Sequence, residues 1–314
     1  MSAVSETDAD RDSARGVTLM ILASLTVPTL DAIAKLLGEA MSPVEIGFLR
    51  YGAQTLILPV LLIALGRRII TPAVRASVWR LALAGSFTGL ASISLYWSLQ
   101  FLPLANAIAI FFVGPLVLTI FGALFLGERV GIHRISAVIV GLCGALIVIR
   151  PNFAEAGWAA VLPLVAATAF AAMVTTVRSM KANLDGLRIQ TASGFFAMLF
   201  LALVLAGGNL FGAELTAVTM PSPGAWALIA VLGITATGIQ MMMTFAVRLA
   251  EQSLLAPFQY LEIVGATAFG YILFDEFPDP ITWAGTAVIL SAGLYVIHRE
   301  RQLKRARIAR VAHP

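Results

Sequence analysis

The sequence is poor in charge, in cysteine and in histidine. Only 12% of the 314 residues are charged, about half of the roughly 25% found in an average soluble domain, which excludes a water-soluble globular fold. The single cysteine, Cys143, lies in an apolar run, so an internal disulfide and a cysteine-based metal cluster are both excluded. His133, His298 and His313 stand far apart without metal-ligand spacing. We therefore predict no metal site and no cofactor.

Motifs of catalysis and of ATP use are missing as well. We find no zinc-binding His/Glu motif, nucleophile elbow or pair of catalytic carboxylates, so no catalytic residue is predicted. The absence of a phosphate-binding glycine loop argues against an ATP-driven pump. A scaffold or channel is expected to carry a soluble partner domain or a ring of like charges, and the sequence has neither. A non-transport scaffold, a channel and an intramembrane enzyme stay as the alternatives to a carrier.

Apolar residues are what the sequence has in abundance, 59% in total. A helix that spans a bilayer needs about 20 of them, and apolar runs of this length recur almost from end to end. Reading these runs against glycine, proline and charged residues predicts an all-α polytopic membrane protein with ten spans. The spans are expected at 16–37, 44–65, 79–101, 105–126, 131–149, 157–178, 187–207, 224–247, 253–274 and 280–298.

The basic residues indicate how these spans are oriented. The net charge is +4, but Lys and Arg lie between apolar segments rather than on one aromatic-rich face, so the expected partner is the lipid bilayer and not nucleic acid. With the N-terminus inside, 18 of the 21 Lys and Arg fall in cytoplasmic loops and tails, all except Lys35, Arg50 and Arg150. We expect a multi-pass protein of the cell inner (plasma) membrane with both termini in the cytoplasm. The first apolar run is expected to be retained rather than cleaved as a signal.

An internal repeat divides the chain into two halves. A shift of 148 residues aligns Gly127-Glu128 with Asp275-Glu276 without a gap. Each half holds five spans, an odd number, so the copies enter the membrane in opposite directions, as in many secondary transporters. The predicted fold is ten transmembrane helices as two inverted five-helix repeats. The expected parts are a cytoplasmic tail at 1–15, a first repeat at 16–150, a second repeat at 151–298 and a basic cytoplasmic tail at 299–314.

Four motifs follow one another in the first half: Leu104-Ala105-Asn106-Ala107, Pro115-Leu116, Leu124-Phe125-Leu126-Gly127-Glu128-Arg129-Val130, and the run from Gly141 to Val148. Together they resemble the EamA-type branch of the drug/metabolite transporter superfamily, over about the whole span-bearing chain. The resemblance implies ten helices around a central cavity and transport of amino acids, nucleotide-like metabolites, vitamins or similar organic solutes. The second half departs from this pattern, because Ile263 stands at the position of Pro115 and Asp275-Glu276-Phe277-Pro278 replaces the Gly-Glu-Arg-Val turn.

Charged side chains at membrane depth mark a candidate site, because an unpaired charge there costs about 2.5 kcal/mol or more. Asp31 and Arg50 each lie about six residues from the outer end of their span, roughly 9 Å deep, so they can meet. They form either an outer gate or contacts for the opposite charges of a zwitterionic substrate, or else a structural ion pair between the first two spans. Gln54 shares the helix face of Arg50. Lys35 shares that of Asp31, and it either contacts substrate or snorkels to the interface.

Glu262, near the centre of the ninth span, is the sharpest candidate in the second half. A carboxylate there either binds a cationic group or takes up a proton during transport, or it is a protonated structural group inside the bundle. Gln259 lies on the same helix face, and Gln240 of the eighth span is also near the centre. Thr237, one turn from Gln240, either lines the same cavity or bonds its own helix backbone.

Aromatic residues and prolines add further candidates. Tyr260, which lies deep in its span, is expected to face the cavity and to stack on a flat or apolar part of a substrate. Tyr96 and Trp97 are secondary candidates for the same contact, and both also fit an interfacial aromatic belt. Three prolines are expected to break or hinge their spans: Pro28, Pro115 and Pro257. Glu128 is expected to cap the fifth span and pair with a neighbouring arginine rather than touch substrate.

The function predicted from these residues is a secondary transporter that moves a small organic metabolite by alternating access. The polar residues are few, central and spread over spans 1, 2, 8 and 9, which favours an amino acid or a similar zwitterionic, cationic or vitamin-like solute. S-adenosylmethionine and riboflavin are the alternative substrates. The sequence leaves the direction of transport, the coupling ion and the formation of a homodimer open.

Overall fold

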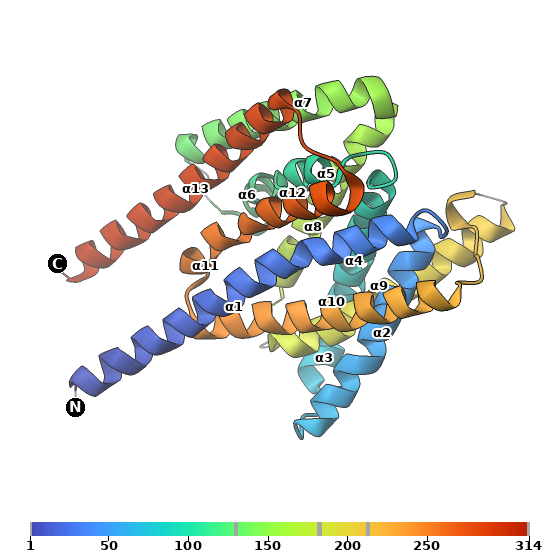
Figure 1. The fold of residues 1–314 in the computed structure, drawn as a ribbon. Coiled ribbons are helices and arrows are strands. Elements are labelled where there is room, and N and C mark those ends of the chain that lie inside the picture. The colour runs from blue at the N-terminus through green and yellow to red at the C-terminus, as the bar shows by residue number, and fades with distance from the viewer. Residues whose placement is uncertain (1, 129–130, 181–183, 212–213, 313–314) are drawn as a thin grey trace.

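The structure is a computed structural model that describes residues 2–128, 131–180, 184–211 and 214–312, and these residues form helices and no strand (Figure 1). The α-helices are α1 (Ser2–Leu37), α2 (Pro43–Ala64), α3 (Pro72–Ala76), α4 (Val78–Ser98), α5 (Leu104–Phe111), α6 (Gly114–Leu126), α7 (Ile132–Ala156), α8 (Leu162–Arg178), α9 (Gly186–Leu210), α10 (Pro223–Leu249), α11 (Gln252–Gln259), α12 (Leu261–Phe274) and α13 (Pro280–Ala312). Two 3-10 turns, Gly157–Val161 and Glu214–Thr216, complete the set.

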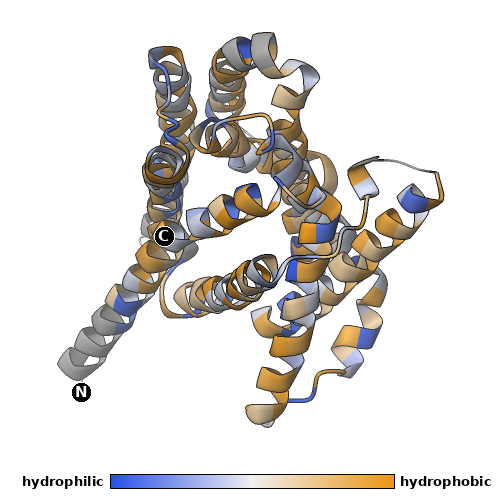
Figure 2. Cartoon of the chain, turned by 45° about the vertical axis from the view of Figure 1, so that its right-hand side comes forward, coloured by the Kyte–Doolittle hydropathy of each residue, from blue (hydrophilic) through white to orange (hydrophobic). Residues whose placement is uncertain are grey.

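Eight segments of the described chain are long and apolar enough to cross a membrane. A shorter apolar helix, Ile135–Arg150, lies within α7, and the pair α11–α12 occupies the ninth predicted span. Figure 2 shows hydrophobic residues along most of the helices, and large apolar side chains such as Leu56 and Ile272 are 73% exposed. Such a surface is stable against lipid rather than water, so the protein is an all-α polytopic membrane protein, as predicted.

The first and last helices extend beyond the predicted spans. α1 begins at Ser2 and α13 ends at Ala312, so the segments predicted as tails continue the helices next to them. Neither extension contains a glycine or a proline to interrupt the helix. Both chain ends lie on the same side of the bundle (Figure 1), as an even number of crossings requires.

Two of the predicted spans are broken near their middle. The fourth is divided into α5 and α6 at Phe112 and Val113, directly before Pro115 in the first turn of α6. The ninth is divided into α11 and α12 at Tyr260, three residues after Pro257. Pro28, in contrast, lies inside an unbroken α1. Because proline cannot donate a backbone hydrogen bond and disrupts the turn before it, Pro115 accounts for the break at Phe112 and Val113. The break at Tyr260 comes after Pro257 and is not explained by its missing N–H, and the hinge role of all three prolines stays a prediction.

The two halves also end corresponding helices in the same way. α6 ends at Gly127 with φ 67°, and α12 ends at Asp275 with φ 55°, both in the left-handed region. The next residue then turns back: the amide of Glu128 donates to the carbonyl of Gly122 over 3.1 Å, and that of Glu276 to Gly270 over 3.0 Å. This is the Schellman type of helix end, and it occurs at positions 148 residues apart.

Asp279 fixes the start of α13. Its Oδ1 accepts hydrogen bonds from the amides of Ile281 (2.7 Å) and Thr282 (2.8 Å), and Oδ2 accepts from the Thr282 hydroxyl (2.9 Å). Slight burial acts to raise the pKa of Asp279, but these hydrogen bonds outweigh it and hold the pKa below its ordinary value. The cap therefore stabilises the helix at neutral pH, and its contribution is lost as the pH falls through this lowered pKa.

Glycine allows the closest contacts between the halves. A Cβ added to Gly85 of α4 would lie 2.6 Å from the Ser193 carbonyl oxygen and 2.6 Å from the Phe196 Cβ, both of α9. Gly233 of α10, 148 residues later, meets Ala53 of α2 in the same manner. Membrane helices without a hydrophobic driving force associate through such small-residue contacts.

We expect Gly85→Ala to lower the melting temperature in detergent, because overpacking a close contact costs about 1–3 kcal/mol. The matched control is Gly238→Ala on α10, where an added Cβ meets no atom within 4 Å. There the gain in helix propensity, up to about 1 kcal/mol, should leave the melting temperature unchanged or raised. Equal effects of the two substitutions would contradict a tight contact at Gly85.

Candidate functional site

A cavity of about 260 Å³ lies between the two halves of the bundle. Polar side chains from both halves line it: Asp31 of α1, Arg50 of α2, Gln240 of α10, Gln259 of α11 and Glu262 of α12. The structure thus brings together five of the predicted substrate-binding residues, although they are separated by up to 231 positions in the sequence.

Hydroxyl groups hold the Arg50 guanidinium at the cavity. Its Nη1 donates to Tyr96 Oη over 2.9 Å, to Tyr51 Oη over 3.3 Å and to Ser92 Oγ over 3.4 Å. The guanidinium carbon also lies 4.8 Å from the centre of the Tyr51 ring, close enough for a cation–π interaction. Tyr51 and Ser92 share a further hydrogen bond of 2.7 Å. Neutral hydroxyl groups therefore hold the Arg50 guanidinium in place, and its positive charge is not neutralised by them.

Two buried polar atoms of the site lack a hydrogen-bond partner among the described residues, namely Asp31 Oδ2 and Arg50 Nε. The side chains of Asp31 and Arg50 make no direct contact in this conformation, although their opposite charges attract each other across the site. A buried polar atom without a partner costs about 1–3 kcal/mol, and more when it is charged.

Glutamine side chains continue the polar region toward the neighbouring helices. Gln54 is buried and donates from Nε2 to the Gln190 carbonyl over 3.2 Å, and Gln190 donates from Nε2 to Gln240 Oε1 over 3.3 Å. Gln54 itself does not line the cavity. It lies behind the site and is linked through Gln190 to Gln240, which does.

Aromatic rings form much of the apolar lining. Tyr96, Phe112 and Phe170 all face the cavity. The ring of Phe112 lies 5.1 Å from that of Tyr260, and the ring of Phe170 lies 5.6 Å from that of Phe111. Aromatic faces next to a guanidinium and carboxylates suit a solute that has both an apolar part and charged groups.

Several predicted residues lie away from this cavity. Lys35 forms an ion pair with Glu276, and Trp97 packs edge-on against Trp158 with the ring centres 5.0 Å apart. The hydroxyl of Thr237 bonds the Gly233 carbonyl of its own helix over 2.8 Å.

Tyr260 differs from the prediction that it faces the cavity. Its hydroxyl points at Gly293 of α13, where the missing side chain leaves room for it. Of the three prolines, Pro115 lines the cavity, whereas Pro28 packs against Gly265 of α12. Tyr51, Ser92, Phe112 and Phe170 are cavity residues that the sequence analysis did not single out, and no spacing or composition signal distinguishes them from other span residues.

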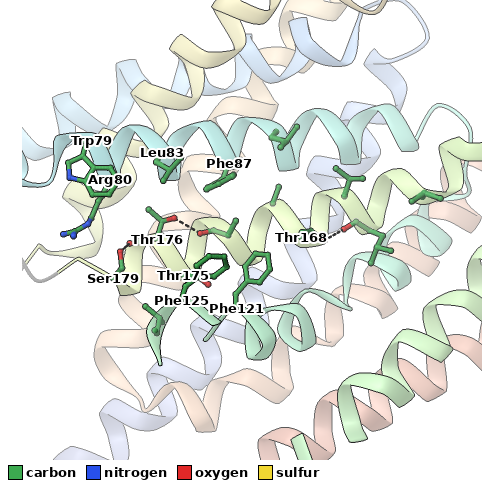
Figure 3. A pocket seen from close by; sticks show the side chains of 17 residues that line it. Trp79, Arg80, Leu83, Phe87, Phe121, Phe125, Thr168, Thr175, Thr176 and Ser179 are labelled. Carbon is green, nitrogen blue, oxygen red and sulfur yellow. Dashed lines mark hydrogen bonds between the residues drawn. The ribbon is translucent and has the colours of Figure 1, made fainter. Parts of the chain in front are cut away.

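A second, larger cavity of about 760 Å³ lies between α4 and α6 over α8. Figure 3 shows its apolar lining, with Leu83 and Phe87 on one side and Phe121 and Phe125 on the other. Its threonines offer no free group, since Thr168 and Thr176 bond back to their own helix (Figure 3). The smaller cavity is therefore the more polar of the two.

The comparisons with known proteins agree with this architecture. The sequence profile of the EamA-like transporter family matches residues 14–150 and 157–298, one match in each half. The chain belongs to the EamA-like transporter family. The fold is similar to that of a protein in a solved crystal structure, with a TM-score of 0.60 and 18% sequence identity. The match covers 94% of this chain and 99% of the other chain.

Curated relatives of this EamA-like chain are transporters of different solutes. A riboflavin transporter of Rhizobium johnstonii is 29% identical over 203 residues, which are 65% of this chain and 65% of that protein. A pseudopaline exporter of Pseudomonas aeruginosa is 26% identical over 88% of this chain and 94% of its own. An S-adenosylmethionine uptake transporter of Rickettsia prowazekii is 23% identical over 94% and 96%. This EamA-like protein is accordingly a multi-pass membrane transporter of small metabolites.

We expect Tyr96→Phe to lower the melting temperature in detergent, because a hydrogen bond to a charged group is worth about 1.5–3 kcal/mol and the Arg50 guanidinium loses its shortest one. Tyr271→Phe is the matched control, since that residue is 57% exposed and its ring contact with Phe277 needs no hydroxyl. If both variants melt at the wild-type temperature, the hydroxyl of Tyr96 does not hold Arg50.

Proposed function

We propose that this transporter carries an amino-acid-sized zwitterionic metabolite through the cavity between its halves by alternating access. The observation that carries the proposal is the pair of opposite charges, Asp31 and Arg50, which line one cavity without a direct ion pair between them. A carboxylate of the solute binds Arg50, and its ammonium group binds Asp31. In lipid surroundings such opposite charges would be costly unless a ligand or a pathway used them.

The size of the cavity supports a small solute. Its volume of about 260 Å³ lies just under the range of about 300–1,000 Å³ typical of pockets for drug-sized ligands. An amino acid fits this space better than a flavin does. The apolar side chain of the solute then packs against Tyr96, Phe112 and Phe170.

Glu262 is the second acidic group at the site. It either binds a further cationic group of the solute or exchanges a proton as the transport cycle proceeds. S-adenosylmethionine, which combines an amino-acid end with an additional positive charge, is the second candidate substrate. The full-length match to S-adenosylmethionine uptake transporters and the two carboxylates favour it. Since it is about as large as a flavin, its binding requires the cavity to widen.

We place the protein in the cell inner membrane with both termini in the cytoplasm. The distribution of Lys and Arg between the spans supports this orientation, and so does the common side of the two chain ends. We also propose that the carrier works without a catalytic residue, metal or cofactor of its own.

The test is the melting temperature of the purified protein in detergent against amino acids, S-adenosylmethionine, riboflavin and nucleosides. A solute that binds only the folded protein raises the melting temperature by mass action. We expect a selective rise with a zwitterionic solute. Arg50→Gln should weaken the apparent affinity about tenfold or more, as loss of a charge-assisted hydrogen bond requires.

Matched controls separate a loss of binding from a general change of charge. Arg75→Gln on α3 and Glu39→Gln after α1 remove the same charges from exposed positions outside the cavity, and they should leave the ligand-induced rise intact. Asp31→Asn and Glu262→Gln test the cationic end of the solute. A response to riboflavin or nucleosides alone, or one that persists in Arg50→Gln, would refute a zwitterionic substrate.

A further inference from the structure

A partly buried ion pair joins the two halves at one end of the bundle. Lys35 of α1 donates from Nζ to both carboxylate oxygens of Glu276, over 2.6 and 2.7 Å, and to the Leu102 carbonyl over 3.0 Å. Glu276 in turn accepts from the Leu104 amide over 3.1 Å. The Lys35 and Glu276 side chains are only 14% and 27% exposed. This contact ties α1 to the loop after α12 and to the connection between α4 and α5, and we refer to this end as the Lys35 face.

The opposite end, which carries the chain termini and is called the Glu128 face below, has a counterpart. Glu128 follows α6 as Glu276 follows α12, 148 residues later, with the same left-handed residue before it and the same backbone turn. Its Oε1 accepts from Arg178 at the end of α8 over 2.5 Å. α8 occupies in the second half the place of α1 in the first, so the two ion pairs correspond under the inverted repeat.

The two ion pairs differ in their exposure and in the number of chain segments that each carboxylate bonds. The Arg178 and Glu128 side chains are 45% and 34% exposed, and among the described residues the carboxylate of Glu128 bonds Arg178 and no other segment. The position equivalent to Leu104 is Gln252, at the start of α11. The groove between α4 and α6 reaches this same end, where Arg80, Leu126 and Ser179 line it (Figure 3).

We propose that Glu276 and Glu128 form an alternating latch for the two faces of the transporter, an inference that rests on the alternating access proposed above. In this conformation Glu276 closes the Lys35 face by holding Lys35 and the α4–α5 connection together. In the opposite conformation Glu128 closes its own face by holding Arg178 and the α10–α11 connection. The backbone N–H of Gln252 then donates to Glu128, as the backbone N–H of Leu104 donates to Glu276 here. Each carboxylate is thus a positioning residue that contacts no solute.

The experiment measures access to the cavity from each face. A cysteine replaces Ala91, which lines the cavity on α4, in a chain whose only cysteine is removed by Cys143→Ser. The protein is reconstituted in liposomes, and a membrane-impermeant maleimide is added to one side at a time. Reference cysteines at the exposed positions Glu39 and Arg75 report which face is outward.

Glu276→Gln should increase the labelling rate from the Lys35 face about tenfold, since a charge-assisted hydrogen bond that favours one conformation shifts the equilibrium by about that factor. Lys35→Met removes the same ion pair from the other side and should act alike, which keeps the test valid if one variant does not fold. Glu128→Gln is the matched control and should not increase this rate.

Two results would overturn the latch: wild-type labelling rates in both Glu276→Gln and Lys35→Met, or an equal increase in Glu128→Gln. Labelling needs no solute, so its outcome is separate from the binding test of the proposed substrate. Selective solute binding with unchanged labelling refutes the latch alone. Altered labelling without any solute response refutes the substrate class and leaves the latch in place.

Discussion

Inside a bilayer no water reaches a polar atom, and every polar group of the protein must therefore find a partner in the protein. In a helix the backbone N–H and C=O groups bond each other. Most hydroxyls do the same within the spans: Thr88, Thr168, Thr175 and Thr237 each donate to the carbonyl four residues earlier. Asp31 and Arg50, the two charged residues with a buried side-chain atom that lacks a partner among the described residues, lie at the cavity between the halves.

The same constraint determines where the backbone departs from regular helix. α5 and α6 are separated at Phe112, which lines the cavity, and α11 and α12 at Tyr260, which packs against Phe112 over 5.1 Å. Irregular backbone at membrane depth is tolerated where it is buried in protein or lines a cavity. The two breaks thus bring the two halves into contact at the depth of the polar site.

Much of the fold could be predicted from the sequence, because span length and proline depend on local properties. The site was predicted in outline: the cost of membrane charge singles out Asp31, Arg50 and Glu262, and these three line one cavity. The partners of these groups could not be predicted. Arg50 is surrounded by hydroxyl groups of its own helix and of α4, and Lys35 pairs with Glu276, which is 241 positions away. Both contacts depend on how the helices pack together, and no single segment of the sequence encodes this packing.

The glycine contacts at Gly85 and Gly233 have a mechanical consequence. At each of these positions the glycine lets two helices approach without a bulky side chain between them, so a small sliding movement of one helix past the other needs little repacking there. α4 on α9 and α10 on α2 are such contacts, and the repeat relates them to each other. They are suited to act as paired shear planes, along which one bundle of rigid helices moves against the other while the core on either side stays intact.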